Sequence, residues 1–306
     1  MNTRVKAAAL ALAGFALIIL SGCGNPVVSA LNIPTASAVT ITNNQAPKVN
    51  RVIALANGSA EIISALGLKK LLVGRDIAST DADLSSVSVV TSGHQVIPEK
   101  IISLNPDLVI IDKSTGPQVA ITALRSAGIK VVQTPEAWTL ADIEPKVTAI
   151  AAAIGVPVDG AKLSKTIAAA SLPAANLKSG TRVAFLYLRG GSAIYLIGGK
   201  GSGADSLLSA VGAVDVGAQK LKNPFNAMTS EALISLNPEV LLVMTKGLES
   251  TGGVTGLIAL PGIAQTDAGE NKRIVSVDDS LLLSFGPRTA DLLAQLHIAI
   301  DTVMKK

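Results

Sequence analysis

Short hydrophobic runs alternate with amphipathic segments along most of this chain. Runs that stop at Gly, Ser or Asn predict buried strands, and segments with apolar residues three or four apart predict helices. In the first half, the predicted strands are 51–56, 71–73, 87–90, 108–112 and 129–133. The predicted helices there are 60–66, 98–103 and 118–127. This alternation is typical of a doubly wound α/β fold, with central parallel sheets flanked by helices.

The second half repeats the pattern after a long alanine-rich region. Its predicted strands are 182–188, 194–197, 240–244 and 273–277, and its predicted helices are 204–211 and 288–303. The alanine-rich region has few turn signals, and 141–154 and 158–170 are predicted to be helical. We interpret residues 141–178 as a helical connector between an N-terminal lobe, 51–140, and a C-terminal lobe, 179–306.

The two halves also share a sequence segment. Glu99-Lys-Ile-Ile-Ser-Leu-Asn-Pro-Asp-Leu-Val-Ile-Ile111 recurs as Glu231-Ala-Leu-Ile-Ser-Leu-Asn-Pro-Glu-Val-Leu-Leu-Val243. A helix turn, an Asn-Pro stop and a buried strand are a common local combination, which is one explanation of the repeat. We favour the other explanation, two related lobes around a cleft.

The N-terminus has the pattern of an export signal. Arg4 and Lys6 precede the apolar run 7–20, which is short for a membrane span. Residues 1–22 are therefore predicted to be a signal peptide.

The lone cysteine follows this signal. Leu20-Ser-Gly-Cys23 resembles a bacterial lipobox, which implies a lipoprotein whose lipidated first residue is Cys23. As the only cysteine, Cys23 has no internal disulfide partner. The alternative is a secreted protein with a stray cysteine. Residues 23–50, rich in Ser, Thr, Asn, Ala and Pro, are predicted to be a flexible tether to the membrane.

Composition excludes several classes of protein. The net charge of +4 is too small for a nucleic-acid footprint, and 2% aromatic residues argue against a site that stacks several rings. The glycine-rich segment 198–203 lacks Walker spacing, since no Gly-Lys-Ser/Thr opens the next helix. Two histidines and one cysteine leave no multi-histidine or Cys-His site, so we expect no enzyme activity.

The end of the strand at 183–189 carries the most suggestive chemistry. Tyr187 and Arg189 are two residues apart, so their side chains lie on one face of the strand. A fixed positive charge favours the phenolate form, which suits a ferric ion. The same pattern also fits an ordinary half-buried tyrosine. Tyr195, the other tyrosine, is the alternative ligand, although no arginine lies two residues from it.

Several motifs together resemble the class III substrate-binding proteins of bacterial iron-compound and cobalamin ABC importers. Besides the repeated Ile-Ser-Leu-Asn-Pro, they are Ser59-Ala-Glu-Ile-Ile-Ser-Ala-Leu-Gly67, Val73-Gly-Arg-Asp76, Gly201-Ser-Gly-Ala-Asp205 and Phe285-Gly-Pro-Arg288. The resemblance covers about residues 50–306. It implies two lobes joined by one long connecting helix, and delivery of a ligand to an ABC permease with its ATPase.

Within that family, three segments are most similar to the haem-binding members of actinobacterial haem uptake systems. They are Phe185-Leu-Tyr-Leu-Arg-Gly190, Met244-Thr-Lys-Gly-Leu-Glu-Ser250 and Gly93-His94. The resemblance implies that ferric haem, Fe(III) protoporphyrin IX, binds between the lobes. Haem itself or haem-donor proteins are then the source of the ligand.

The resemblance also assigns roles around the haem. It implies His94 and Tyr187 as axial ligands and Arg189 as support for the tyrosine. Met244 falls in the segment that supplies a methionine near the haem, and is otherwise a core residue. Arg75 matches an arginine near the haem edge, where a cation could pair with propionates.

The second histidine is not predicted to be a ligand. His297 lies in the apolar helical segment 292–300, where a packing role is expected. His94 follows a predicted strand end and a glycine, where ligand residues of open sheets gather.

Surface acids are candidates for docking to the permease. Glu61 matches a glutamate that relatives use for this purpose. The relatives supply one such glutamate from each lobe. In the second lobe, Asp205 is the candidate, but Ser209 occupies the position where relatives often have Glu. Ordinary solvated acids are the alternative interpretation.

We therefore expect a monomeric lipoprotein on the outer face of the cytoplasmic membrane that captures haem for an ABC importer. The alternative is the same fold binding an iron-siderophore or cobalamin. A further alternative is an exported metal-binding protein.

Overall fold

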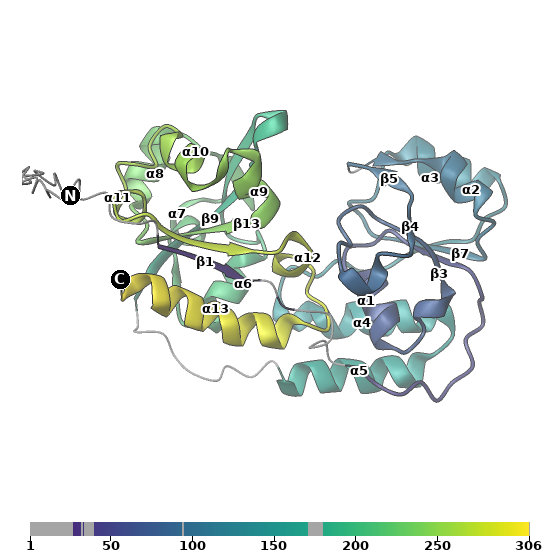
Figure 1. The fold of residues 1–306 in the computed structure, drawn as a ribbon. Helices are drawn as coiled ribbons and strands as arrows, with labels where there is room; N and C mark the ends of the chain where they lie inside the picture. Colours follow the sequence, from purple (N-terminus) through teal and green to yellow (C-terminus); the bar gives the residue numbers. More distant parts are fainter. Residues whose placement is uncertain (1–26, 32, 34–39, 94, 171–179, 306) are drawn as a thin grey trace, which may run out of the picture.

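The computed structural model describes residues 27–31, 33, 40–93, 95–170 and 180–305. The predicted signal peptide, Cys23 and His94 lie outside these residues. The chain folds into two α/β lobes that lie side by side, each with its own sheet (Figure 1). No helix in the described part of the chain is long and apolar enough to cross a membrane.

The first lobe contains a parallel five-stranded sheet with the order β4-β3-β2-β7-β8. These strands are β2 (Val52–Ala54), β3 (Leu72–Arg75), β4 (Ser88–Val89), β7 (Leu108–Ile111) and β8 (Val131–Gln133). The flanking helices are α1 (Ser59–Ala65), α2 (Pro98–Ser103) and α3 (Gln118–Ser126). A small hairpin, β5 (Thr91–Ser92) and β6 (Gln95–Val96), stands beside this sheet. Parallel strands flanked by helices confirm the predicted fold class.

The second lobe contains a seven-stranded sheet, ordered β1-β14-β13-β9-β10-β12 with β11 beside β9. Its strands are β1 (Val27–Leu31), β9 (Arg182–Arg189), β10 (Ile194–Gly198), β11 (Val214–Asp215), β12 (Phe225–Ala227), β13 (Val240–Met244) and β14 (Arg273–Val277). Its helices are α6 (Ala204–Ala210), α7 (Val216–Lys220), α8 (Ser230–Leu236), α9 (Thr245–Ser250), α10 (Gly253–Ala259), α11 (Asp267–Glu270), α12 (Asp279–Leu282) and α13 (Thr289–Met304). β10 runs antiparallel to β9 because the turn Gly190–Ser192 is too short for a parallel crossover.

The repeated sequence segment folds in the same way in both lobes. Helix α2 leads through Asn105 to β7, and helix α8 leads through Asn237 to β13. Both asparagines have positive φ, 44° and 39°, a left-handed conformation that asparagine tolerates better than most residues. The prediction of a repeated helix, Asn-Pro stop and strand is therefore confirmed.

The N-terminal segment is not a free tether. β1 pairs in parallel with β14, and Leu31 is buried in the core. Farther along, the backbone N–H of Lys48 donates to the carbonyl of Ile154 at 2.9 Å. The prediction of a flexible tether over 23–50 is wrong for these residues because their backbone groups find partners in both lobes.

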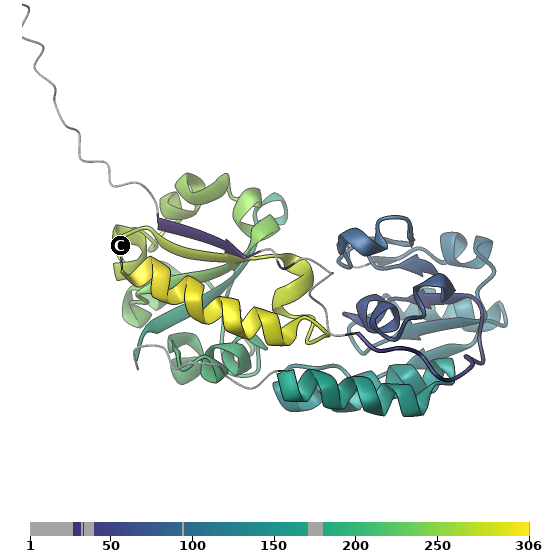
Figure 2. The same ribbon diagram turned by 60° about the horizontal axis from the view of Figure 1, so that its bottom comes forward.

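The connector is two helices rather than one. α4 (Ile143–Ile154) ends at Gly155, whose φ of 93° only glycine adopts readily, and α5 (Pro157–Ala170) begins two residues later. The two helices pack against each other beneath the first lobe (Figure 2). The expected single long helix is therefore interrupted at Gly155.

Candidate functional site

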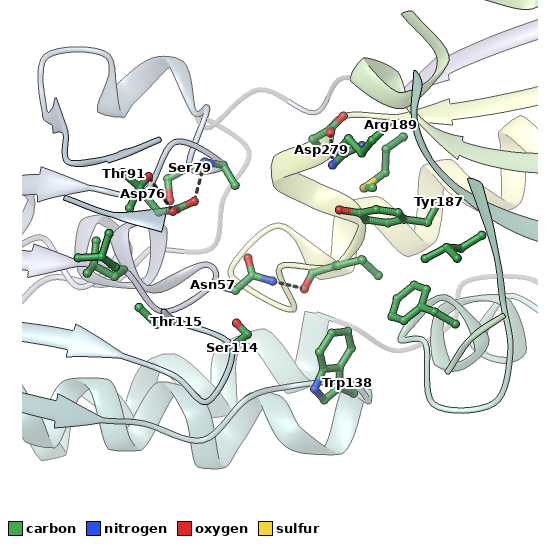
Figure 3. Close-up of a pocket in the computed structure, with 17 residues that line it drawn as sticks. Asn57, Asp76, Ser79, Thr91, Ser114, Thr115, Trp138, Tyr187, Arg189 and Asp279 are labelled. Carbon is green, nitrogen blue, oxygen red and sulfur yellow. Dashed lines mark hydrogen bonds and ion pairs between the residues drawn. The ribbon is translucent and has the colours of Figure 1, made fainter. Parts of the chain in front are cut away.

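A cleft of about 420 Å³ lies between the lobes and is lined by residues of both (Figure 3). The first lobe contributes mainly polar side chains: Asn57, Asp76, Ser79, Thr91, Ser114 and Thr115. The second lobe contributes a largely apolar and aromatic wall: Tyr187, Leu196, Phe225, Met244 and Leu283, together with Arg189 and Asp279. Trp138, the only tryptophan, also borders the cleft (Figure 3). The two walls therefore differ in chemistry.

The polar wall is built from the carboxyl ends of parallel strands, where open α/β sheets bind ligands. Asn57 follows β2, Asp76 follows β3, and Ser114 and Thr115 follow β7. Asp112, a buried carboxylate, orders this edge. It accepts hydrogen bonds from the backbone N–H of Asn57 at 2.7 Å, from Ser114 Oγ at 2.7 Å and from Thr115 Oγ1 at 2.9 Å. These hydrogen bonds within the protein hold Asn57, Ser114 and Thr115 in place at the cleft.

Asp76 is tied to its own loop and to the small hairpin. Its carboxylate accepts the backbone N–H of Ala78 at 2.7 Å and the hydroxyl of Thr91 at 3.0 Å. Sequence reasoning did not single out Asp76 or Asn57. Asn57 directly follows the predicted strand 51–56, and Asp76 lies three residues after the predicted strand 71–73, which was the available signal.

Tyr187 lies on the second-lobe wall, opposite Leu196 of β10. The guanidinium carbon of Arg189 is 4.6 Å from the centre of the Tyr187 ring, and Phe225 meets this ring edge to face at 5.7 Å. The Tyr187 hydroxyl points toward the first lobe (Figure 3). No described residue hydrogen-bonds this hydroxyl. Arg189 thus stacks on the ring and leaves the phenol oxygen open to the cleft.

Tyr195 does not line the cleft. It is opposite Leu188 in the hairpin, on the other face of the sheet from Tyr187, and packs with the core cluster that contains Leu186 and Leu188. The alternation of side chains along β10 therefore separates the two candidate tyrosines.

Met244 is both a core residue and a cleft residue. Its side chain is only 3% exposed, yet it borders the cleft because it is the last residue of β13. Met244 is therefore a core residue at the cleft, and a role beside a bound haem stays a prediction.

Arg75 does not line the cleft, in contrast to the prediction. Its guanidinium donates to the carbonyls of Leu84 at 3.0 Å, Val87 at 3.1 Å and Ser79 at 2.8 Å. Arg75 therefore holds the loop after β3 in place through its Nε and Nη1.

Glu61 is not a surface acid. It is 3% exposed and pairs with Arg288, with 2.8 Å between Glu61 Oε1 and Arg288 Nε. Burial raises the pKa of Glu61 above its usual value, although Arg288 opposes this shift. The predicted docking role of Glu61 is wrong because the carboxylate is enclosed between the lobes.

Asp205 is half-buried in the first turn of α6. Its carboxylate accepts the backbone N–H groups of Gly201 at 2.7 Å and Gly203 at 3.0 Å, so it orders the glycine-rich loop. Ser209 is exposed on the same helix. Docking through Asp205 stays a prediction.

Of the two histidines, the structure describes only His297. His297 lies on α13 and does not border the cleft. His94 lies outside the described residues. Thr91 and Val96, which flank it in the hairpin, do line the cleft. A ligand role for His94 stays a prediction.

Residues 52–281 match the family model described as periplasmic binding protein, and the chain belongs to that family. Among solved structures it is similar to the heme binding protein HmuT, with 33% identity, a TM-score of 0.83 and coverage of 90% of this chain and 97% of that chain. It is also similar to the periplasmic heme-binding protein RhuT from Roseiflexus sp. RS-1, with 34% identity, a TM-score of 0.76 and coverage of 83% and 99%.

Two curated relatives match most of the chain, and the name of one of them states a ligand. The uncharacterized ABC transporter substrate-binding lipoprotein YvrC of Bacillus subtilis is 27% identical over 93% of this chain and 94% of its own length. The vitamin B12-binding protein of Vibrio parahaemolyticus is 26% identical over 88% of this chain and 95% of its own length. The chain is thus an ABC-transporter substrate-binding protein that acts outside the cytoplasm, with a permease and an ATPase as partners, and not an enzyme.

Proposed function

We propose that this protein binds ferric haem in the cleft between its lobes and delivers it to an ABC permease. The observation that carries the proposal is the free phenol oxygen of Tyr187, which faces the cleft while Arg189 stacks on its ring. Phenolate is a known protein ligand of haem iron. A ferric ion that binds a phenol oxygen displaces its proton.

The second-lobe wall suits a flat apolar macrocycle. Leu196, Phe225 and Met244 line this wall together with Tyr187, so a porphyrin face would have apolar contacts beside the iron ligand. His94, between two cleft-lining residues of the hairpin, is the proposed ligand from the first lobe. The similarity to HmuT supports this set, because its solved forms include alanine variants of a histidine, a tyrosine and an arginine.

The charges of the cleft predict how the haem is oriented. Among the described residues that line it, Arg189 is the only cation, and Asp279 pairs with it at 3.1 Å. Two propionates inside the cleft would lack a free cationic partner. We therefore propose that the propionates point toward solvent at the mouth of the cleft.

Cobalamin is the second candidate, favoured by the vitamin B12-binding relative. The polar wall with Asn57, Ser114 and Thr115 offers groups for its amides. A direct comparison of haemin with cobalamin in a thermal-shift assay separates the two ligands, because each stabilises only a protein that binds it.

Spectroscopy of the haemin complex tests the iron ligand. We expect haemin to give a Soret band with a phenolate-to-iron charge-transfer band, and Tyr187→Phe to remove the charge-transfer band. Tyr195→Phe is the matched control, since Tyr195 lies on the opposite face of the sheet. His94→Ala is expected to change the spectrum separately. A charge-transfer band that survives Tyr187→Phe contradicts the assignment.

A further inference from the structure

Trp138 places an aromatic side chain on the first-lobe side of the cleft. The chain has one tryptophan, two tyrosines and four phenylalanines, and Trp138, Tyr187 and Phe225 line the cleft. The low aromatic content argued against several rings in one site, but folding brings these three to one cleft. Tyr187 and Phe225 belong to the second lobe, whereas Trp138 lies five residues before α4. Trp138 is the one aromatic residue among the described first-lobe residues that line the cleft.

Trp138 lies where the two lobes touch each other. Two residues after it, the backbone N–H of Leu140 donates to Ser206 Oγ of the second lobe at 3.2 Å. Gly203 allows the indole to approach the second lobe closely, since a Cβ at this position would lie 3.4 Å from Cε3 of Trp138 and 3.1 Å from Leu283 Cδ2. Leu283 also lines the cleft. We call the part of the cleft bordered by Trp138 and Leu283 its closed end.

The closed end presents apolar surface because its polar groups already have partners. Trp138 Nε1 donates to Glu136 Oε2 at 3.2 Å. The Leu283 carbonyl accepts the side-chain amide of Asn57 at 2.9 Å, a contact marked by a dashed line in Figure 3. The indole and leucine side chains can therefore offer a ligand mainly carbon atoms. Such a surface favours an apolar part of a ligand over a charged one.

The charges near the closed end also disfavour an anionic part of a ligand. Glu136 carries a carboxylate beside the indole, and Asp76 adds another on the first-lobe wall. Lys146 faces Glu136, but its amine donates to the Ser284 carbonyl at 2.6 Å and Lys146 does not line the cleft. A propionate at the closed end would lose its hydration without gaining a cationic partner. This end therefore suits the edge of a porphyrin that carries no propionate.

We propose that Trp138 is a specificity-determining residue that receives the vinyl-bearing edge of haem at the closed end. This inference rests on the proposed haem function. Haem carries both propionates on one side of the ring and both vinyl groups on the other, so propionates at the mouth of the cleft direct the vinyl groups to Trp138. A porphyrin with charged groups on both sides binds poorly in this arrangement. So does a corrin, because amide side chains surround its ring.

Three ferric porphyrins that differ only at the two vinyl positions test this orientation in the full-length protein. Haemin has vinyl groups there, ferric deuteroporphyrin IX has hydrogens and ferric coproporphyrin III has propionates. The parent should bind haemin roughly tenfold more tightly than ferric coproporphyrin III, because the additional carboxylates would have to leave water. It should bind haemin a few-fold more tightly than ferric deuteroporphyrin IX, which lacks the apolar vinyl contact. Titrations followed by Soret absorbance give the three dissociation constants.

Two substitutions at Trp138 assign this preference to the indole. Trp138→Gln puts an amide at the closed end and should reduce the preference for haemin over ferric coproporphyrin III to about threefold or less. Trp138→Phe keeps an apolar ring and should retain the preference of the parent. Each preference is a ratio of two dissociation constants measured on the same protein, so partial unfolding of a variant does not imitate a loss of selectivity. The charge-transfer band of bound haemin should be the same in both variants, because the iron ligands are unchanged.

The proposal is overturned if ferric coproporphyrin III binds the parent as tightly as haemin, or if Trp138→Gln keeps the full preference for haemin. In both cases haemin still binds, so the proposed function stands while the role of Trp138 falls. A parent protein that binds none of the three porphyrins, or binds cobalamin in their place, overturns the proposed function and the role of Trp138 together.

Discussion

Lys146 shows at the scale of one residue how the lobes depend on a buried charge. Its amine donates to the Ser284 carbonyl of the second lobe at 2.6 Å and faces the carboxylates of Asp112, Glu61 and Glu136. Burial lowers the pKa of Lys146 to about 8, although these carboxylates oppose the shift. This buried lysine of α4 therefore loses its proton at a pH where exposed lysines keep theirs.

The depressed pKa predicts a pH dependence of stability. Between about pH 8 and 10.5 the unfolded chain binds the Lys146 proton more tightly than the folded protein does, so this group makes stability rise with pH there. Denaturant titrations across this window should show a rise in the free energy of unfolding that Lys146→Met lacks. Lys305→Met, on an exposed lysine, is the control. Parallel pH profiles for the parent and Lys146→Met would contradict this prediction.

At the scale of elements, β1 has the largest consequence for how the protein is attached. Only a few residues separate Cys23 from Val27, the first residue of β1. At ~3.5 Å per residue, a lipid on Cys23 would hold the edge of the second lobe within roughly 14 Å of the membrane. A lipid anchor on Cys23 would therefore keep the second lobe close to the membrane. A flexible tether up to residue 50 would instead let both lobes move away from the membrane.

Leu31 and Val28 test whether β1 is part of the second lobe. Leu31 is buried, and Val28 on the same strand is 39% exposed. We expect Leu31→Asp to separate β1 from β14, because a carboxylate in the core is costly. Amide hydrogen exchange should then accelerate across Arg273–Val277. Val28→Asp should leave it slow, and equal exchange in both variants would argue against the pairing.

Elements with strong periodicity were predictable from sequence, and those defined by long-range pairing were not. The helix at 98–103 has the predicted bounds because Pro98 fixes its start and an Asn-Pro pair its end. β1 was missed because a short strand in a Ser- and Pro-rich segment is stabilised only by β14. The site shows the same contrast. Tyr187 was predicted from Arg189 two residues away and from the family resemblance, whereas Asp279 contacts that arginine only in the folded chain.

At the scale of the whole molecule, a buried ionic cluster joins the two lobes. Arg288, from the second lobe, pairs with Glu61 at 2.8 Å and with Asp81, both from the first lobe. It also donates to the carbonyl of Ile33 at 2.9 Å, two residues after the end of β1. Two carboxylates and a backbone carbonyl therefore fix one arginine, and with it the relative position of the lobes.

Removing Arg288 should destabilise the protein and loosen the lobes. Arg288→Met leaves Glu61 and Asp81 buried without their partner, which typically costs about 3–5 kcal/mol. Because burial raises the pKa of both acids, the loss should be smaller at low pH, where both are protonated, and grow as pH rises.

Arg182 provides the control for this cluster. It also faces two carboxylates, Glu239 and Asp267, but on the surface of the second lobe, so Arg182→Met should cost about 1 kcal/mol or less. Chemical denaturation measures both costs, and small-angle scattering should show a larger radius of gyration only for Arg288→Met. Adding Glu61→Gln and Asp81→Asn to Arg288→Met removes the unpaired charges, so stability should recover in part. Scattering should still report the looser arrangement, because the contact that set the distance between the lobes is gone; if it instead matches the parent, the cluster supplies stability alone.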